Sequence, residues 1–493
     1  MRRLPGWAVA LVAGALPALA FPAPSWWWLA WFALVPLLLV VRAAPTTVDG
    51  SVRAWCGLAG YVLSTQYWLL PSSGPALVLM AAGVGALWLP WGWAAHRLLA
   101  GSPLAAMLVL PSAWVAAEAV RSLPGLGGPW AALGASQWNQ PATAASAAVG
   151  GMWLTSFLIV AVNAAIAGMV LQRRRAIPLV TAVVCAGLGP AWFALGPAPP
   201  AGATARVALV QPGVIDDSAA RQAASEALTA TLAGRHVDLV VWGESSVGAD
   251  PAGHPEVARR LTELSRRVGA YLLVNVDAPA PGGGIYKSAV LVGPAGLLGF
   301  YSKTRLVPFG EYVPLRPLLG WLTRHTKAAG EDRRRGDGPV VLNAGSLAIG
   351  PLISFEAIFP DLPRREVQLG AELLVYQTST STFQGSWAQP QLAGAVAMRA
   401  VEVGHPAVHA GLSGDSAAFD ARGRTLAWCS SGYRGVVVVD VPLGSHTTPY
   451  QRLGDWLPAL AFAILAGAGV VAIVRSRGSR RGVHDQHVDL GPA

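Results

Sequence analysis

The chain reads VVWGES at 240–245, where an apolar run ends abruptly in an acidic residue, Glu244. A short run rich in Val and Trp, followed by a glycine, is typical of a buried strand. Similar runs recur from 204 to 445, and helical patterns lie among them at about 218–234, 255–268 and 390–403. Strands that alternate with helices in this way predict an α/β sandwich. The expected strands are 207–211, 238–242, 271–276, 288–292, 347–353, 372–376, 407–410 and 436–440.

Upstream of this region the composition changes. The 493-residue chain is 53% hydrophobic and only 13% charged, about half the charge of a typical soluble domain. Residues 1–200 hold nine Arg, no Lys and two acids, and every other charged residue follows them. This composition excludes a disordered chain and an ordinary cytosolic enzyme. The net charge of +10 does not indicate a nucleic-acid partner, because many Arg stand at the ends of apolar runs, as topology signals do.

Eight apolar runs approach the ~20 residues that a helix needs to cross a bilayer. We therefore expect a polytopic α-helical membrane domain of about eight helices over 1–200 and 449–475, an α/β domain over 201–448 and a tail over 476–493. The runs cover about 6–21, 25–41, 54–71, 76–96, 103–120, 150–171, 177–195 and 456–474.

The orientation of these runs follows from their short loops, because cytoplasmic loops are enriched in Lys and Arg. With the N-terminus in the cytoplasm, all but one of the arginines of the first 200 residues face the cytoplasm. The exception is Arg121. This assignment makes the α/β domain extracytoplasmic and returns the tail to the cytoplasm.

The segment 315–337 allows two interpretations. It combines apolar residues at 318–322 with His325, Lys327 and three arginines at 333–335. Such a segment either skims the bilayer, with its basic residues on lipid phosphates, or forms a solvated loop.

No cofactor or metal site is expected from the sequence. The three cysteines, Cys56, Cys185 and Cys429, form no metal-binding or disulfide pattern. The glycine run at 282–284 is not followed by the Lys-Ser/Thr pair of a phosphate-binding loop.

Three short segments carry candidate chemistry, and each is weak evidence by itself. The first is the run that ends in Glu244. The second is YSK at 301–303, which leads into LVPFGEYVP at 306–314. The third is LISFE at 352–356.

Taken together and in this order, the segments resemble those of the bacterial apolipoprotein N-acyltransferases, membrane members of the nitrilase superfamily. The resemblance covers nearly the whole chain. It includes PSAW at 111–114 with Glu118 and Arg121, and MRAVE at 398–402. The string at 306–314 is the most specific of the motifs.

The resemblance implies an αββα sandwich of the nitrilase type and a ping-pong acyl transfer at the bacterial inner membrane. A phospholipid would supply the acyl chain, and the N-terminal amine of a diacylated lipoprotein would accept it. Glu244 matches the general base and Lys303 matches the residue that stabilises the oxyanion. Glu311 and Glu356 match acidic residues that orient the site.

Two positions depart from the family pattern. Ser354 occupies the place of the catalytic Cys, and a hydroxyl is far less acidic than a thiol, whose pKa is about 8.5. The segment STSTF at 379–383 lacks the Asp and Trp that the family has there.

These departures leave three functions open. The first is a Ser-dependent N-acyltransferase, and the second is an inactive paralogue that binds lipid or lipoprotein. The third, a membrane amidase, conflicts with the string at 306–314 and with the number of apolar runs. Cys429 is a further candidate nucleophile, although no activating neighbour is evident.

Overall fold

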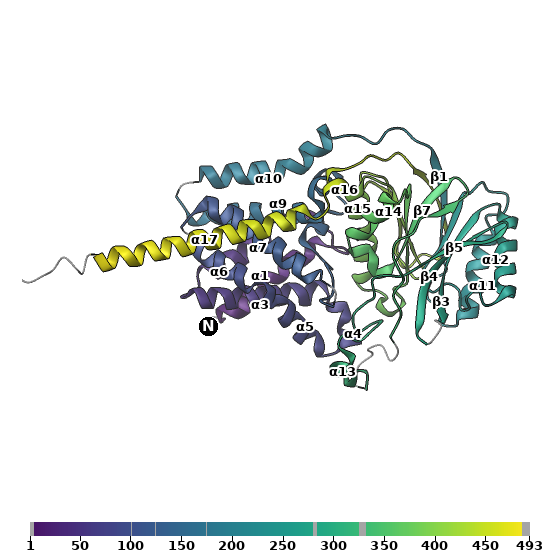
Figure 1. The fold of residues 1–493 in the computed structure, drawn as a ribbon, viewed down its shortest axis with the longest axis horizontal. Coiled ribbons are helices and arrows are strands. Elements are labelled where there is room, and N and C mark those ends of the chain that lie inside the picture. Colours follow the sequence, from purple (N-terminus) through teal and green to yellow (C-terminus); the bar gives the residue numbers. More distant parts are fainter. Residues whose placement is uncertain are drawn as a thin grey trace, which may run out of the picture.

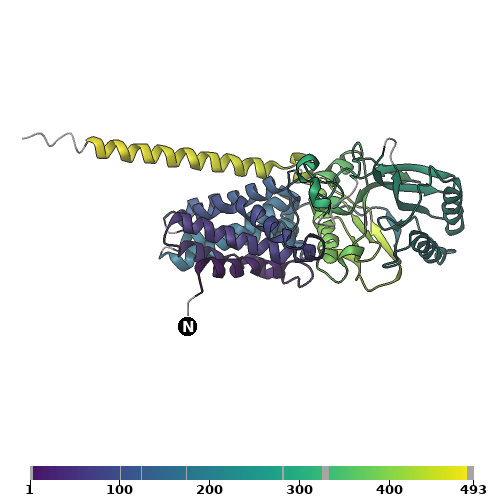
Figure 2. The same ribbon diagram turned by 90° about the horizontal axis from the view of Figure 1, so that it is seen from below.

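The computed structural model describes residues 4–99, 101–123, 125–173, 175–279, 283–324 and 332–485. It has two parts that lie end to end, a helical bundle and an α/β sandwich (Figure 1). The C-terminal helix returns from the sandwich along the bundle and extends beyond it (Figure 2).

All eight apolar runs are helical. Among the described residues, five helical stretches are long and apolar enough to cross a membrane, whereas those at Gly6–Ala20 and Trp27–Arg42 are shorter. A chain with these helices is a membrane protein. The main helices are α1 (Gly6–Ala15), α2 (Val35–Arg42), α3 (Thr47–Thr65), α5 (Ala76–Gly85), α6 (Leu89–Leu98), α7 (Pro103–Arg121), α9 (Ala147–Leu171), α10 (Ala176–Leu195) and α17 (Trp456–Asp485).

Local sequence explains where several of these helices begin or bend. The Thr46 hydroxyl accepts a hydrogen bond from Asp49 N and so caps α3. Helix α9 kinks at Gly150 and Gly151. A Cβ on Gly151 would come within 2.7 Å of the Tyr450 ring, so the kink lets the chain beyond the sandwich pack closely against α9.

Within the described residues, the α/β part contains two six-stranded sheets. The first has the order β12-β1-β2-β3-β4-β5 and the second β11-β10-β9-β8-β7-β6. The strands are β1 (Thr204–Gln211), β2 (Leu239–Trp242), β3 (Tyr271–Pro279), β4 (Ile285–Gly293), β5 (Gly296–Ser302), β6 (Leu342–Ala344), β7 (Leu347–Ile353), β8 (Leu373–Thr378), β9 (Ala407–Gly411), β10 (Ser416–Phe419), β11 (Thr425–Cys429) and β12 (Gly435–Pro442).

Helices cover both outer faces of the sheet pair. Helices α11 (Ser218–Ala230) and α12 (Pro255–Val268) lie on the side remote from the bundle, and α14 (Asp361–Gln368) and α15 (Ala388–Val403) lie on the side toward it (Figure 1). Between the sheets, apolar residues of both, such as Val241 and Val375, form one buried cluster. The predicted αββα sandwich and helical membrane domain are confirmed.

All eight expected strands are present, and four further strands were not expected. β6 has only three residues, β10 and β11 form a short hairpin, and β5 is an edge strand with exposed Leu298 and Phe300. Short or half-exposed strands carry little of the apolar pattern that identifies a strand in a sequence.

The two parts of the molecule meet along α15. The Glu402 side chain accepts a hydrogen bond from Met152 N of α9 at 2.8 Å. Gln391 accepts one from Trp130 Nε1 at 2.7 Å and donates one to Thr65 O at the end of α3. These contacts fix the sandwich on one end of the bundle.

The segment 315–337 begins with the short helix α13 (Arg316–Leu319), where Leu318 is 71% exposed, and Trp321 beyond it is 56% exposed. Arg316 pairs with Asp332. His325 and Lys327 lie outside the described residues, and both interpretations of the segment, bilayer-skimming and solvated loop, stay predictions.

Candidate active site

The candidate nucleophile lies at a sharp turn between a strand and a helix. β7 ends at Ile353, and Ser354 begins the 3-10 helix η7 (Ser354–Ile358) with a φ of +54°. A left-handed conformation at a residue other than glycine is strained and is common at functional sites. Ser354 therefore lies at a strand-to-helix elbow, as candidate nucleophiles of this kind do.

Glu356 holds the elbow in place. Its carboxylate is fully buried and accepts a hydrogen bond from Ile353 N at 2.7 Å. The other oxygen accepts hydrogen bonds from the Tyr301 hydroxyl and Thr304 N, both at 2.7 Å. Burial raises the pKa of Glu356. Glu356 therefore ties the elbow to the chain just after Lys303.

Glu244 follows the end of β2 and is 4% exposed. Its Oε1 lies 3.1 Å from Lys287 Nζ and 3.6 Å from Lys303 Nζ. Its Oε2 accepts a hydrogen bond from Ser379 N at 3.0 Å. Burial acts to raise the pKa of Glu244, but the two ammonium groups outweigh it and lower the pKa to about 2. Glu244 is therefore an ionised carboxylate with both oxygens engaged.

The string at 306–314 forms a loop that places Glu311 on Lys303. Glu311 Oε1 lies 2.8 Å from Lys303 Nζ, and Oε2 accepts a hydrogen bond from Val307 N. Burial acts to lower the pKa of Lys303, but Glu311 and Glu244 outweigh it and raise the pKa. Lys303 is thus a buried cation between two carboxylates, well suited to stabilising an anion.

Lys287 is a site residue that the sequence did not indicate. It lies on β4, is 9% exposed, and donates a hydrogen bond to Ser245 Oγ at 2.8 Å. It also lies 3.4 Å from Asp277 Oδ1. The available signal was a lysine within the otherwise apolar strand pattern at 285–293.

The divergent segment at 379–383 contacts Glu244, the candidate base, directly through its backbone. Besides the hydrogen bond from Ser379 N, Glu244 N donates to Thr378 O at 3.2 Å. Phe383, at the end of this segment, packs edge-on against Trp68 of the bundle with ring centroids 4.8 Å apart. The segment therefore connects Glu244 to the membrane domain.

The structure thus joins Glu244, Lys303 and Glu311 directly and places Glu356 behind the elbow. Ser354 Oγ makes no hydrogen bond to any described residue, although Ser354 is half-buried at the elbow.

A narrow, partly open cavity lies beside the elbow, between the two parts of the molecule. Leu123 and Gly128 line it from the bundle, and Arg305, Tyr312 and Phe355 line it from the sandwich. A Cβ on Gly128, whose φ is +70°, would come within 2.8 Å of the Phe359 ring, so only a glycine lets this loop pass so close to the elbow helix.

Cys429 lies on β11, the edge strand of the second sheet. Burial and the nearby Asp415 raise the pKa of its thiol. A thiol that is harder to ionise than usual is a poor nucleophile, so the environment of Cys429 argues against its use as a substitute for Ser354.

The elbow, the carboxylate–lysine pair and the two-sheet sandwich define a carbon-nitrogen hydrolase domain carried by a helical membrane domain. Residues 206–448 match the model of the carbon-nitrogen hydrolase family, and residues 13–165 match the model of the apolipoprotein N-acyltransferase N-terminal domain. The chain belongs to the apolipoprotein N-acyltransferase family, a family of membrane acyltransferases, and this confirms the resemblance of the sequence motifs.

Two relatives are similar over nearly their whole length. The apolipoprotein N-acyltransferase of Geobacter metallireducens is 30% identical over 97% of this chain and 96% of its own. That of Azotobacter vinelandii is 32% identical over 97% of both chains. Among solved structures, a nitrilase-superfamily amidase from Nesterenkonia sp. AN1 is 22% identical, with a TM-score of 0.37 over 53% of this chain and 95% of its own.

Proposed function

We propose that the protein transfers an acyl chain from a phospholipid to the N-terminal amine of a diacylated lipoprotein. The single observation that supports this function best is the buried contact of Lys303 with both Glu244 and Glu311 beside the elbow. Acyl transfer requires a proton acceptor and a fixed cation for an oxyanion, and these are the roles that we propose for Glu244 and Lys303.

In the proposed first step, Ser354 Oγ attacks the carbonyl carbon of the phospholipid ester, and its proton moves to Glu244. Lys303 stabilises the negative charge on the carbonyl oxygen. The ester C–O bond then breaks, and the lysophospholipid alkoxide takes the proton from Glu244. The acyl chain stays on Ser354 as an oxygen ester.

In the second step, the free amine of the lipoprotein attacks the Ser354 ester. Glu244 accepts a proton from the nitrogen and returns it to Ser354 Oγ as the C–O bond breaks. An amide on the lipoprotein forms and the serine is regenerated. Glu311 and Glu356 do not touch the reacting atoms in this scheme, and they orient Lys303 and the elbow.

The cavity beside the elbow suits a lipid donor. It lies at the end of the bundle, and it combines Phe355 and Leu123 with the guanidinium of Arg305. Apolar walls favour acyl chains, and a cation favours the phosphate of a headgroup.

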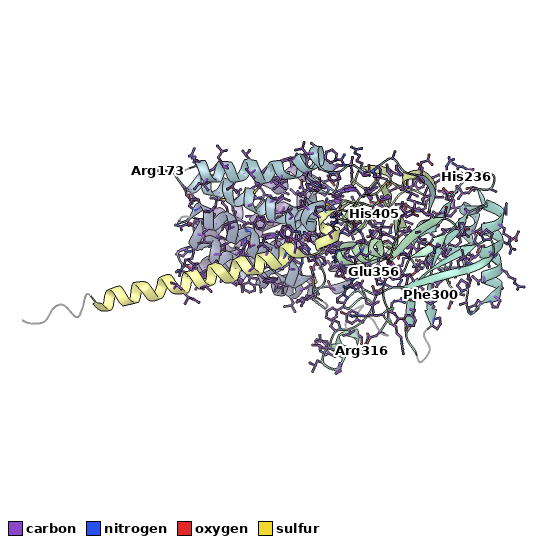
Figure 3. The ribbon with its side chains drawn as sticks, turned by 45° about the horizontal axis from the view of Figure 1, so that its top comes forward. Arg173, His236, Phe300, Arg316, Glu356 and His405 are labelled. Atoms are coloured by element: carbon purple, nitrogen blue, oxygen red, sulfur yellow. The ribbon has the colours of Figure 1, made fainter. Side chains whose placement is uncertain are left out.

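We also propose that the membrane is the bacterial inner membrane and that the sandwich faces away from the cytoplasm. The domain limits are then 1–200, 201–448, 449–475 and 476–493. Arg173 and the N-terminus lie at the end of the bundle remote from the sandwich (Figures 1 and 3). Arg121, the exception to the charge pattern, is 2% exposed and donates to Trp130 O, so it is not a loop charge that sets topology.

Labelling of single cysteines tests the orientation. In a Cys429→Ser background, Asp337→Cys should react with an impermeant maleimide on intact cells. Val48→Cys, an exposed position near the start of α3, should react only after lysis. The opposite result would reverse the proposed orientation.

A second candidate function is an inactive paralogue that binds lipid or lipoprotein. The observation that favours it is the absence of a hydrogen bond from Ser354 Oγ to any described residue, so that no base is seen to activate the hydroxyl.

Turnover by the native protein separates the two functions. The purified protein is mixed with phospholipid and a diacylated lipopeptide, and mass spectrometry measures the N-acylated product. Product that disappears in Ser354→Ala but persists in Ser218→Ala, a change at an exposed serine of α11, supports the enzyme. Binding of the lipopeptide without product supports the paralogue.

A further inference from the structure

Two lysine side chains contact the same carboxylate oxygen of Glu244, the candidate base. Lys287 Nζ of β4 is closer to Glu244 Oε1 than Lys303 Nζ is, at 3.1 Å against 3.6 Å. Lys303 has its shorter contact, 2.8 Å, with Glu311. The cation that most directly holds Glu244 is therefore Lys287.

Lys287 is itself held in place by other groups. Ser245 Oγ accepts its hydrogen bond at 2.8 Å, and Asp277 Oδ1 of β3 lies 3.4 Å away. Ser245 has a φ of +56° and accepts, at its carbonyl, a hydrogen bond from Arg221 of α11. A strained residue next to the base thus helps to aim the lysine at that base.

The charged groups around Glu244 come from every neighbouring element. They are Lys287 on β4, Lys303 after β5, Asp277 on β3, Glu311 in the loop at 306–314 and Arg333, which lies 3.5 Å from Asp277. Of these, Glu311 draws Lys303 away from Glu244. Among the described residues, the carboxylate oxygen nearest to Lys287 Nζ is that of Glu244, at 3.1 Å, and the next is that of Asp277, at 3.4 Å.

An ammonium group beside a carboxylate favours the ionised form and so makes that carboxylate a weaker proton acceptor. A weak acceptor is a poor match for a serine hydroxyl, which gives up its proton far less readily than a thiol.

We propose that Lys287 is a positioning residue that keeps Glu244 ionised and weakens it as the acceptor of the proton of residue 354. This inference rests on the proposed role of Glu244 as general base. On this proposal, the pair of Lys287 and Glu244 controls how readily residue 354 loses its proton and becomes a nucleophile. The elbow alone does not.

A thiol reporter at the elbow tests the proposal without any lipid substrate. In the full-length Ser354→Cys protein, intact mass follows the rate of alkylation by iodoacetamide between pH 3.5 and pH 9, with Cys429→Ser as background. The reaction needs the introduced elbow thiol to lose its proton to Glu244, so the acid limb of the rate profile reports the charge state of Glu244.

The parent should show no acid limb in this range, because the pKa of its Glu244 is about 2. Lys287→Met and Lys287→Gln in this background should move the limb upward by about 1–3 pH units and so bring it into the range, the effect expected for loss of an opposite charge at this distance. Both should also raise the alkylation rate near neutral pH, because Glu244 becomes a stronger base. Lys287→Arg keeps the positive charge and should restore the profile of the parent. Two neutral variants are used because one of them can fail to fold, and a melting curve identifies a misfolded sample.

Superimposable profiles of the parent, Met and Gln variants would overturn the proposal. So would an upward shift in the Arg variant equal to that of the Met variant, or an elbow thiol that does not react at any pH. Failure of the proposed function would give a different result. If the native protein does not acylate the lipopeptide but the neutral Lys287 variants still shift the acid limb, then the proposed substrate is wrong and the role of Lys287 stands.

Discussion

The Glu402 carboxylate of α15 accepts a hydrogen bond from the backbone N–H of Met152 on α9 at 2.8 Å, so a buried charge of the sandwich joins it to the membrane bundle. Arg399, one turn earlier, lies 2.7 Å from the same carboxylate and donates to Ile358 O of the elbow helix η7. The connection between the two parts of the molecule therefore passes directly behind the candidate nucleophile.

Replacing Arg399 by Met should destabilise the protein strongly. Removal of one partner leaves the Glu402 charge buried and uncompensated, a change that costs about 3–5 kcal/mol. The thermal unfolding midpoint in detergent micelles should fall markedly, and Arg399→Met/Glu402→Gln should recover part of the loss. Arg266→Met, which breaks an exposed ion pair on α12, is the control and should change the midpoint little. Equal effects of the two single changes would contradict the interpretation of Arg399.

Lys303→Met should slow acylation of the elbow residue. The lysine is buried and lies between Glu244 and Glu311, and removal of one oxyanion donor typically slows acyl transfer by about 10²–10³-fold. The measurement is the rate of acyl-adduct formation from phospholipid in the Ser354→Cys background. Lys303→Arg keeps the charge but changes the geometry, so its acylation rate should lie between that of the Ser354→Cys parent and that of Lys303→Met. A rate unaffected by Lys303→Met would remove Lys303 from the reaction.

The Ser354→Cys protein should separate the two halves of the reaction. A thiol at the elbow can lose its proton to Glu244, so incubation with phospholipid should add one acyl chain to the intact mass. A lipopeptide added afterwards should then remove the adduct, as the proposed second step requires. The segment at 379–383 lacks two residues of the family pattern, and a poorly placed acceptor slows transfer. An adduct that persists after the lipopeptide is added would therefore show that this segment fails to place the acceptor and would contradict the proposed second step. Ser354→Ala should give no adduct.

The sequence predicted the parts of the fold that depend on local pattern. Each long apolar run became a helix, and each strongly apolar strand run became a strand. Strand β6 and the hairpin of β10 and β11 were not predicted, because strands of three to five residues that contain Ala and Ser carry too little apolar periodicity.

The candidate site was predictable only in part. Glu244, Lys303 and Glu356 were found because they stand in recognisable motifs, but Lys287 stands in none. Its role depends on the antiparallel pairing of β3 and β4, which sets Lys287 opposite Asp277 and aims it at a carboxylate far earlier in the chain. Contacts of this kind arise from tertiary register, and a local sequence pattern does not contain them.

The buried carboxyl group of Glu366 predicts how the free energy of unfolding depends on pH. Glu366 lies on α14, fully buried, against β7 just before the elbow, where a Cβ on Gly350 would come within 2.7 Å of its Oε2. Burial, with a smaller contribution from the charge of Glu356, raises its pKa to about 9. Between the ordinary pKa of the unfolded chain and pH 9, the folded state holds a proton that the unfolded state has released. The free energy of unfolding should therefore fall as pH rises through this window.

Glu366→Gln should abolish that fall, because the amide keeps the volume of the neutral acid without the proton. At pH 7 the variant should be more stable than the native protein by up to about 3 kcal/mol, and below pH 4.5 the two should melt alike. Unfolding midpoints between pH 4 and pH 9 measure this, with Glu263→Gln on the exposed face of α12 as the surface control. If Glu366→Gln lowers the midpoint at neutral pH instead, then Glu366 is ionised in the folded protein and stabilises the elbow as an anion.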